Sequence, residues 1–273
     1  MKLIHNMYSL SILKNYKAAV AKNSQAIATL SSGKKLNSAK DNPSKIDDSD
    51  KLKISILSRK AASGNMQDTD SMVQTFDGAL QEMNNNVSRL KELAVKAASG
   101  TISDGDSAII KTEMDGILNS INDLANNTKF NGVNLSQGTV GGPGTTKTAT
   151  IGSEADETID IPLQNLSTAG LGLGNVTGSG SDQELKDIDA ATKTITSLRS
   201  KYGAIETRLE DSINNSDEIT DTFSSAQSGL EDADMATESM KNASTQILIK
   251  AGTSLMAQSN QLPQDVLNIL SSV

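Results

Sequence analysis

Few residues of this chain could carry out chemistry, and none of them has the spacing of a known catalytic or metal site. His5 is the only histidine, so neither an HExxH zinc motif nor a Ser-His-Asp triad can be assembled. Cysteine is absent, which excludes disulfides and thiolate metal sites. Asp47, Asp48, Asp50 and the acidic run 231–234 lack the regular spacing of a calcium loop, so we interpret them as helix-capping carboxylates. We therefore expect no catalytic residue, no cofactor and no metal, and hence no enzyme.

The amino-acid composition excludes further classes of protein and partner. The 273 residues include three Phe, three Tyr and no Trp, so aromatic rings cannot anchor a compact mixed core. A net charge of −8 argues against a nucleic-acid partner, which requires basic clusters. No run of 18 or more apolar residues is present, so we expect no membrane span. The first twenty residues are too polar for a secretory signal, so export would need a route that does not read one.

Apolar residues at heptad spacing indicate long helices, which must position any functional residues. Twelve of fourteen heptad positions between Ile188 and Ala233 are apolar, as are all eight between Val73 and Ala97. A shorter stripe runs from Ile110 to Leu124. A helix of residues 188–233 would be about 69 Å long at about 1.5 Å per residue. Any one stripe is explained by ordinary core packing, but their length and repetition predict helices laid side by side in a rod.

Local signals set the boundaries of the predicted helices. The first helix covers residues 6–31 and stops at Gly33, and 34–42 form a polar linker. Asn42 and Pro43 read as an N-cap and a first helical proline, which begin a helix to about Ser99. Ser103 with Asp106 resembles a capping box for a helix through Leu124.

The tract of about 136–182 has a different composition, because it is rich in Gly, Ser and Thr. Within it, residues 148–151 and 158–161 are predicted as two short strands joined by a polar turn, and the rest as outward-facing loop. The helical pattern resumes at Gln183 and continues to about Gln261, and Pro263 is expected to interrupt it.

Both ends of the chain are amphipathic, although chain ends are the segments that a core covers least. A single terminal helix is marginal in water, so we expect the two ends to pair with each other and then with other copies. The prediction is a polymer whose innermost layer contains both chain ends, which are disordered in the monomer. Its apolar core residues are Leu10, Leu13, Val20, Ile27, Leu30, Leu248, Leu255, Leu262, Leu267 and Leu270, with Tyr16 on the same face of the first helix.

Several segments along the chain match one known family. They are HNMYSL (5–10), LSSGKKLNSAKDN (30–42), RLKELAVKAASGT (89–101), TKFNGVNL (128–135), TATIGSEADETIDI (148–161), YGAIETRLEDSINN (202–215), EDADMATESM (231–240) and SLMAQSNQLPQDVLNIL (254–270). In this order they resemble bacterial flagellin, the subunit of the flagellar filament. The 136–184 tract is too short for large outer domains, so the resemblance implies a minimal flagellin.

The resemblance implies a fold and a function. The fold would be mainly α, a long antiparallel helical bundle with a small β-hairpin, and the termini would form a helical coiled pair. Residues 1–42 and 236–273 would form the inner filament layer, and 43–235 the rod-like bundle. The chain would be exported unfolded by the flagellar type III apparatus and would polymerise outside the cell into the filament that serves motility. Its partners would be other copies, an export chaperone, and the cap and junction proteins.

Two matched segments bear on partners. By resemblance, Arg89, Leu93 and Glu113 would contact an innate immune receptor of vertebrates, although Lys96 replaces the family's usual glutamine. The alternative for these three residues is a solvated rod face plus one seam neighbour. The segment 43–56 departs from the family pattern in a region that contacts neighbouring subunits. The alternative function is a hook–filament junction protein, which shares the terminal helices and caps the assembly in few copies.

Overall fold

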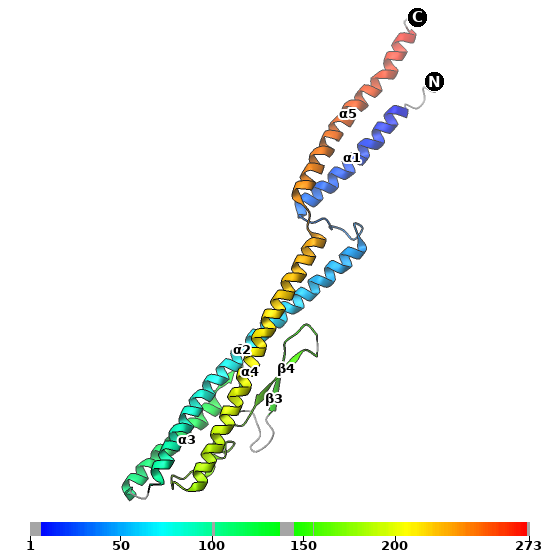
Figure 1. Cartoon of the computed structure of the whole chain (residues 1–273). Helices are drawn as coiled ribbons and strands as arrows, with labels where there is room; N and C mark the ends of the chain where they lie inside the picture. The colour runs from blue at the N-terminus through cyan, green and yellow to red at the C-terminus, as the bar shows by residue number, and fades with distance from the viewer. Residues whose placement is uncertain (1–6, 100–101, 137–144, 155, 272–273) are drawn as a thin grey trace. The chain divides into compact units, whose positions relative to one another are not determined.

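The computed structural model describes residues 7–99, 102–136, 145–154 and 156–271, and it is mainly helical, as expected (Figure 1). The chain divides into two compact units, one of residues 1–54 and 222–273 and one of residues 55–221. The first unit is here called the terminal unit and the second the rod unit. The helices are α1 (Met7–Ser32), α2 (Pro43–Ala97), α3 (Asp104–Asn127), α4 (Asp182–Glu231) and α5 (Met235–Ser271), and the strands are β1 (Lys129–Phe130), β2 (Val133–Asn134), β3 (Thr145–Thr150) and β4 (Thr158–Leu163).

The predicted heptad stripes form the core of the rod unit. On α2, every stripe residue from Val73 to Ala94 is fully buried. On α4, the stripe is buried from Ile188 to Leu209. The rings of Phe76 and Tyr202 meet with centroids 6.4 Å apart. Because apolar side chains recur at heptad spacing on each helix, these helices bury a continuous seam, and the expected side-by-side packing is confirmed.

Polar contacts fix α2 against α4 at the edges of this seam. Arg199 on α4 donates from Nε to Asp77 Oδ1 on α2 at 2.9 Å. Lys91 Nζ donates to Asp189 Oδ1 at 2.5 Å. These pairs flank apolar layers at two heights along the helices, so they help to set the register of the seam.

The predicted hairpin is confirmed as β3 and β4, which pair antiparallel with Thr145 opposite Leu163 and Thr150 opposite Thr158. Side chains alternate along β4, so that Ile159, Ile161 and Leu163 are buried. Tyr202 on α4 donates its hydroxyl hydrogen to the carbonyl oxygen of Pro162 at 2.8 Å. This bond ties the hairpin to the helical core.

Part of the tract expected to be outward-facing loop belongs to the core instead. Leu166, Leu171, Leu173 and Val176 are buried in the same cluster as the helix stripes. These apolar residues are spaced irregularly, so they carry no helical or strand period that would mark them as buried. The expectation that the whole tract outside the strands faces outward is therefore wrong.

The ends of the helices follow their local signals. Asn42 Oδ1 accepts from the Lys45 amide at 3.2 Å, and Ser103 Oγ accepts from the Asp106 amide at 3.2 Å, so both predicted N-caps are confirmed. Gly33 has a φ of +71° and donates its amide hydrogen to the Thr29 carbonyl oxygen at 2.8 Å, as a glycine C-terminal stop requires.

The C-terminal helical pattern agrees with the structure except at its proline. The pattern expected from 183 to 261 forms two helices, because α4 ends at Glu231 and α5 begins at Met235 after a short break. Asp234 caps α5, since its Oδ1 accepts from the Ala236 amide at 2.9 Å. The expected interruption at Pro263 is wrong, because α5 continues to Ser271. A proline removes one backbone hydrogen bond, and here the surrounding turns keep the helix running.

Candidate functional site: the paired terminal helices

Helices α1 and α5 lie side by side in the terminal unit, which confirms the expected pairing of the chain ends (Figure 1). The seam between them consists of small and polar residues. Ala19, Ala26 and Thr29 are the buried residues of α1, and Thr245 and Ser259 are buried on α5. Gly252 has no side chain, so the Tyr16 ring can lie over it. A Cβ at Gly252 would stand 3.4 Å from Tyr16 Cδ2. Small contact residues allow the two helix axes to approach closely.

A polar layer sets the register of this pair. Asn23 on α1 donates from Nδ2 to Asn242 Oδ1 at 2.7 Å and to Thr245 Oγ1 at 3.0 Å. Near the chain ends, Ser9 Oγ donates to Asn260 Oδ1 at 3.3 Å. A polar pair inside a helical seam is satisfied in one alignment only, so it favours that alignment over slipped ones.

The large apolar residues of the two helices point away from this seam. Val20 is 40% exposed, Ile27 49% and Leu248 56%. Leu10, Leu13 and Leu255 are exposed as well, Leu30 and Tyr16 are half-buried, and the side chains of Leu262, Leu267 and Leu270 lie outside the described part of the chain. The further residues Tyr8, Met240 and Ile247, which sequence analysis did not single out, enlarge the exposed set. The terminal unit therefore presents apolar surface that its own fold does not cover.

A clasp joins the segment after α1 to the end of α4. Glu231 accepts a hydrogen bond from Lys34 Nζ and another from Ser49 Oγ on α2. Backbone bonds flank it, from the Lys35 amide to the Glu231 carbonyl oxygen at 2.7 Å and from the Ala233 amide to the Gly33 carbonyl oxygen at 2.9 Å. The hydrogen bonds from Lys34 and Ser49 lower the pKa of Glu231 to about 2. Glu231 is thus a clasp residue, and the prediction of a helix cap fails for it.

The other acidic residues weighed as metal ligands have local roles. Asp47 pairs with Lys51 one turn along α2 at 2.6 Å, and Asp232 accepts from Ser228 Oγ at 2.5 Å. In the part of the chain that the structure describes, no group of three or more His, Cys, Asp or Glu residues is arranged to hold a metal ion. Likewise, none of the described helices is long and apolar enough to cross a membrane. His5 lies outside the described residues.

Of the three residues matched to receptor contact, two are exposed in the structure and one is buried. Arg89 and Glu113 are exposed and joined by an ion pair at 2.7 Å between Nη2 and Oε1, and Arg89 also pairs with Glu92 at 2.9 Å. Leu93 differs from the expectation of a contact residue, because it is 3% exposed and packs into the core of the rod unit. Its heptad neighbours Leu90 and Ala94 are buried too, and the helical period brings Leu93 to the same seam.

Comparison with known families agrees with this arrangement at both ends of the chain. Residues 4–140 match the bacterial flagellin N-terminal helical region, and residues 185–270 match the bacterial flagellin C-terminal helical region. The chain belongs to the flagellin family. These regions contain α1 and most of α5, so the pair of helices described above is built from matched segments.

Relatives of this family member align over nearly its whole length. The flagellin of Bacillus subtilis (strain 168) is 30% identical over 303 residues, which cover 99% of this chain and 100% of that protein. The flagellar filament 33 kDa core protein of Treponema phagedenis is 30% identical and covers 97% of this chain and 98% of its own. The chain is accordingly a structural subunit of the bacterial flagellar filament, outside the cell, where it serves motility.

Solved structures share the architecture. The crystal structure of Bacillus cereus flagellin is 26% identical, with a TM-score of 0.50 over 56% of this chain and 88% of that one. A putative flagellar hook-associated protein from Vibrio parahaemolyticus has a TM-score of 0.58 over 70% of this chain and 100% of its own, at 12% identity. The second likeness shows the fold alone. The full-length relatives favour a filament subunit over the alternative of a junction protein.

Proposed function

We propose that the exposed apolar residues of α1 and α5 are the contacts by which copies of this chain form the inner layer of the filament. These residues are Leu10, Leu13, Val20, Ile27, Leu248 and Leu255, with Leu30, Leu262, Leu267 and Leu270 completing the set that the sequence predicts. The observation that carries the proposal is the inverted seam, in which small residues face inward and large ones outward. When a second copy covers this apolar surface, each Å² removed from water stabilises the assembly by about 25 cal/mol.

Polymerisation then supplies the stability that the terminal helices lack alone. The described part of the terminal unit buries no large aliphatic side chain within the α1–α5 seam. We infer that residues 7–32 exchange their amide hydrogens rapidly in the monomer and slowly in the filament. Equal protection in both states, measured by hydrogen exchange with mass spectrometry, would overturn this inference.

A matched pair of isoleucines tests the assembly surface. Ile247 on α5 and Ile109 on α3 are both 68% exposed. We expect Ile247→Asp to prevent elongation of filament seeds, because it places a charge in the inner layer, and Ile109→Asp to leave seeded elongation within about threefold of the parent protein. Light scattering and electron microscopy report the elongation. Normal filaments from the Ile247→Asp variant contradict the proposal.

The family relationship supports export through the flagellar type III apparatus and contacts with an export chaperone and with cap and junction proteins. We propose a purely mechanical role without catalytic turnover.

Receptor contact is proposed at the exposed pair Arg89 and Glu113, with Leu93 acting beneath the surface as a packing residue. A receptor reporter assay tests this, with Arg89→Ala expected to lower the response and Arg208→Ala, on another helix, expected to leave it unchanged. An unaltered response to Arg89→Ala excludes that residue.

A further inference from the structure

Charge is divided unevenly between the two units. Residues 55–221 hold 13 Lys and Arg against 24 Asp and Glu, a net charge of −11. The terminal unit, residues 1–54 and 222–273, holds 12 against 9, a net charge of +3. Opposite net charges on two surfaces of one repeating subunit favour contacts between copies in which unlike surfaces meet.

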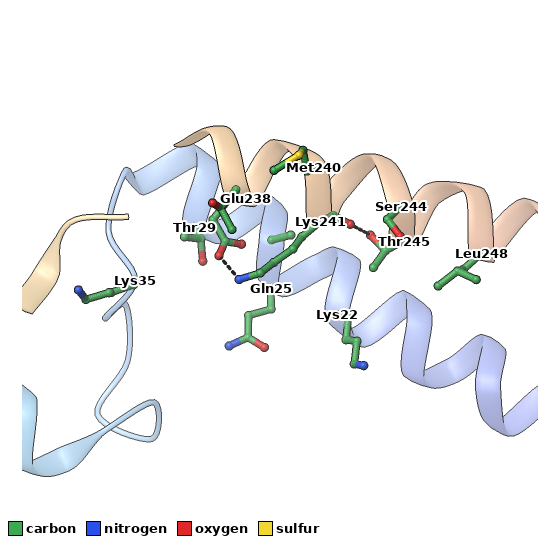
Figure 2. A pocket seen from close by; sticks show the side chains of 12 residues that line it. Lys22, Gln25, Thr29, Lys35, Glu238, Met240, Lys241, Ser244, Thr245 and Leu248 are labelled. Carbon is green, nitrogen blue, oxygen red and sulfur yellow. Dashed lines mark hydrogen bonds and ion pairs between the residues drawn. The ribbon is translucent and has the colours of Figure 1, made fainter. Parts of the chain in front are cut away.

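Basic side chains of the terminal unit gather around two adjoining hollows, which together are called the lysine groove. The first, of about 760 Å³, lies between α1 and α5 and is lined by Lys22, Lys35 and Lys241 (Figure 2). The second, of about 890 Å³, lies between α1 and the segment that follows it, and is lined by Lys35, Lys40 and Lys45. The two hollows share Gln25, Thr29 and Lys35.

The positive charge of the lysine groove is largely uncompensated within the chain. Lys241 is paired with Glu238 at 2.6 Å, and Lys35 Nζ donates to a carbonyl oxygen, that of Gly229, at 2.6 Å. Among the described residues, Lys22, Lys40 and Lys45 form no ion pair with a carboxylate. The one other acid of the lining is Asp41, whose Oδ2 accepts the amides of residues 37 and 38.

The rod unit carries a surface of the opposite sign. Glu206 and Glu210 stand one turn apart on α4. The pairing of Asp77 with Arg199 and of Phe76 with Tyr202 brings Asp70 of α2 to their level. Burial and these two carboxylates raise the pKa of Asp70. Asp70 Oδ1 is buried and has no hydrogen-bond partner among the described residues. Glu206 and Glu210 form no ion pair in the described part of the chain. These three acids are here called the acidic face.

We propose that the lysine groove is an interaction surface for the acidic face of a second copy of this chain. The proposal rests on the polymerisation argued above and names one further contact within the polymer. The occupant is a second copy because most charges of the two surfaces form no ion pair among the described residues, and each subunit carries one groove and one face. A head-to-tail contact of this kind can repeat from copy to copy, as a helical polymer requires. The lysines of the groove and Glu210 of the face lie at exposed positions, so the contact mainly directs the encounter of subunits and is weakened by salt.

Charge reversal and its compensation test the contact. The groove variant is Lys40→Glu with Lys45→Glu, and the face variant is Glu206→Lys with Glu210→Lys. Each is elongated separately from filament seeds of the parent protein at about 0.05 M salt and at about 1 M salt, where the screening length falls to about 3 Å. We expect each variant to elongate at least about tenfold more slowly than the parent at low salt and within about threefold of it at high salt. Circular dichroism confirms that each variant is folded.

Two controls make the result specific. Lys53→Glu, an exposed lysine of α2 outside the groove lining, should elongate within about threefold of the parent at low salt. A chain carrying all four groove and face reversals, grown on seeds of its own kind, should recover to within about threefold of the parent. Unchanged rates for both reversed variants, or slow growth of the combined chain, overturns the contact. The Ile247→Asp variant separates the two proposals, since it should fail to elongate at both salt concentrations.

Discussion

Replacement of Glu231 by glutamine tests the clasp that joins the ends of α1 and α4 within the terminal unit. The carboxylate accepts hydrogen bonds from Lys34 and Ser49, and Gln227 Nε2 donates to it at 3.3 Å. Glutamine has nearly the same shape but no charge. The substitution therefore removes the ion pair with Lys34 while it keeps the packing, so any effect reports on the charge.

The magnitude follows from the lowered pKa of Glu231. A fall from 4.5 to about 2 corresponds to about 3 kcal/mol as an upper bound. The side chain of Lys34 is 50% exposed, so solvent screens the pair, and we expect a loss of about 1–2 kcal/mol. Because the folded pKa lies below the unfolded one, the stabilisation is complete above about pH 4.5 and is lost as the pH falls from there towards 2.

Hydrogen exchange of the clasp amides measures this loss directly. The amides of Lys35 and Ala233 donate across the clasp, so they exchange when it opens. At pH 7 we expect about 5- to 30-fold faster exchange in the Glu231→Gln variant. The control is Asp47→Asn, which removes a pair between two exposed side chains of one helix and should change exchange less than about twofold. Equal exchange in the parent and the Glu231→Gln variant at pH 7 refutes the argument, as does a difference that persists at pH 2.

Four further substitutions test the rod unit by chemical denaturation. Tyr202→Phe removes the bond to the Pro162 carbonyl oxygen and should lower the free energy of unfolding by about 1 kcal/mol; an unchanged midpoint contradicts this. Glu184 is buried, which alone would raise its pKa, but hydrogen bonds from residues 177 and 179 outweigh burial and lower it. Glu184→Gln should thus cost about 1–2 kcal/mol at pH 7, and the difference should shrink as the pH falls below about 4.5. Gly132 has a φ of +80°, so Gly132→Ala should destabilise by about 1 kcal/mol, whereas Gly116→Ala within α3 should stabilise by a similar amount; equal signs refute the argument.

The features that sequence predicts well are those with a local cause. A heptad stripe such as 73–97 requires a helix with one buried face, whatever that face meets. The caps at Asn42 and Ser103 depend on side chains that bond amides three residues away, so short-range sequence is sufficient. The turn between β1 and β2 has the same local origin, because Asn131 and Gly132 both adopt positive φ. No hairpin is among the expected elements at this position, although an Asn-Gly pair is the signal of a two-residue hairpin.

The clasp and the buried loop residues had no such signal. Glu231 meets Ser49, which is 182 residues away, and nothing in the acidic run 231–234 distinguishes the residue that makes this contact. Leu166 and Leu173 lie in a tract whose glycines and hydroxyls indicate an exposed loop, and their burial depends on where the tract crosses the helices. Such contacts follow from tertiary packing, which overrides local composition.

The terminal helices show that apolar residues at helical spacing predict a buried face but not whether the same chain or another copy buries it. The apolar stripe of α1 predicts a buried face, yet Ala19, Ala26 and Thr29 fill the seam with α5. Small residues bury little area, so the seam specifies alignment through Asn23 and Asn242 more than it adds stability. If each of the seven exposed leucine, valine and isoleucine side chains of α1 and α5 gains about 1 kcal/mol when covered, assembly contributes roughly 7 kcal/mol per subunit. Because the seam buries only small side chains, we expect order in α1 and α5 to depend on the neighbouring subunits.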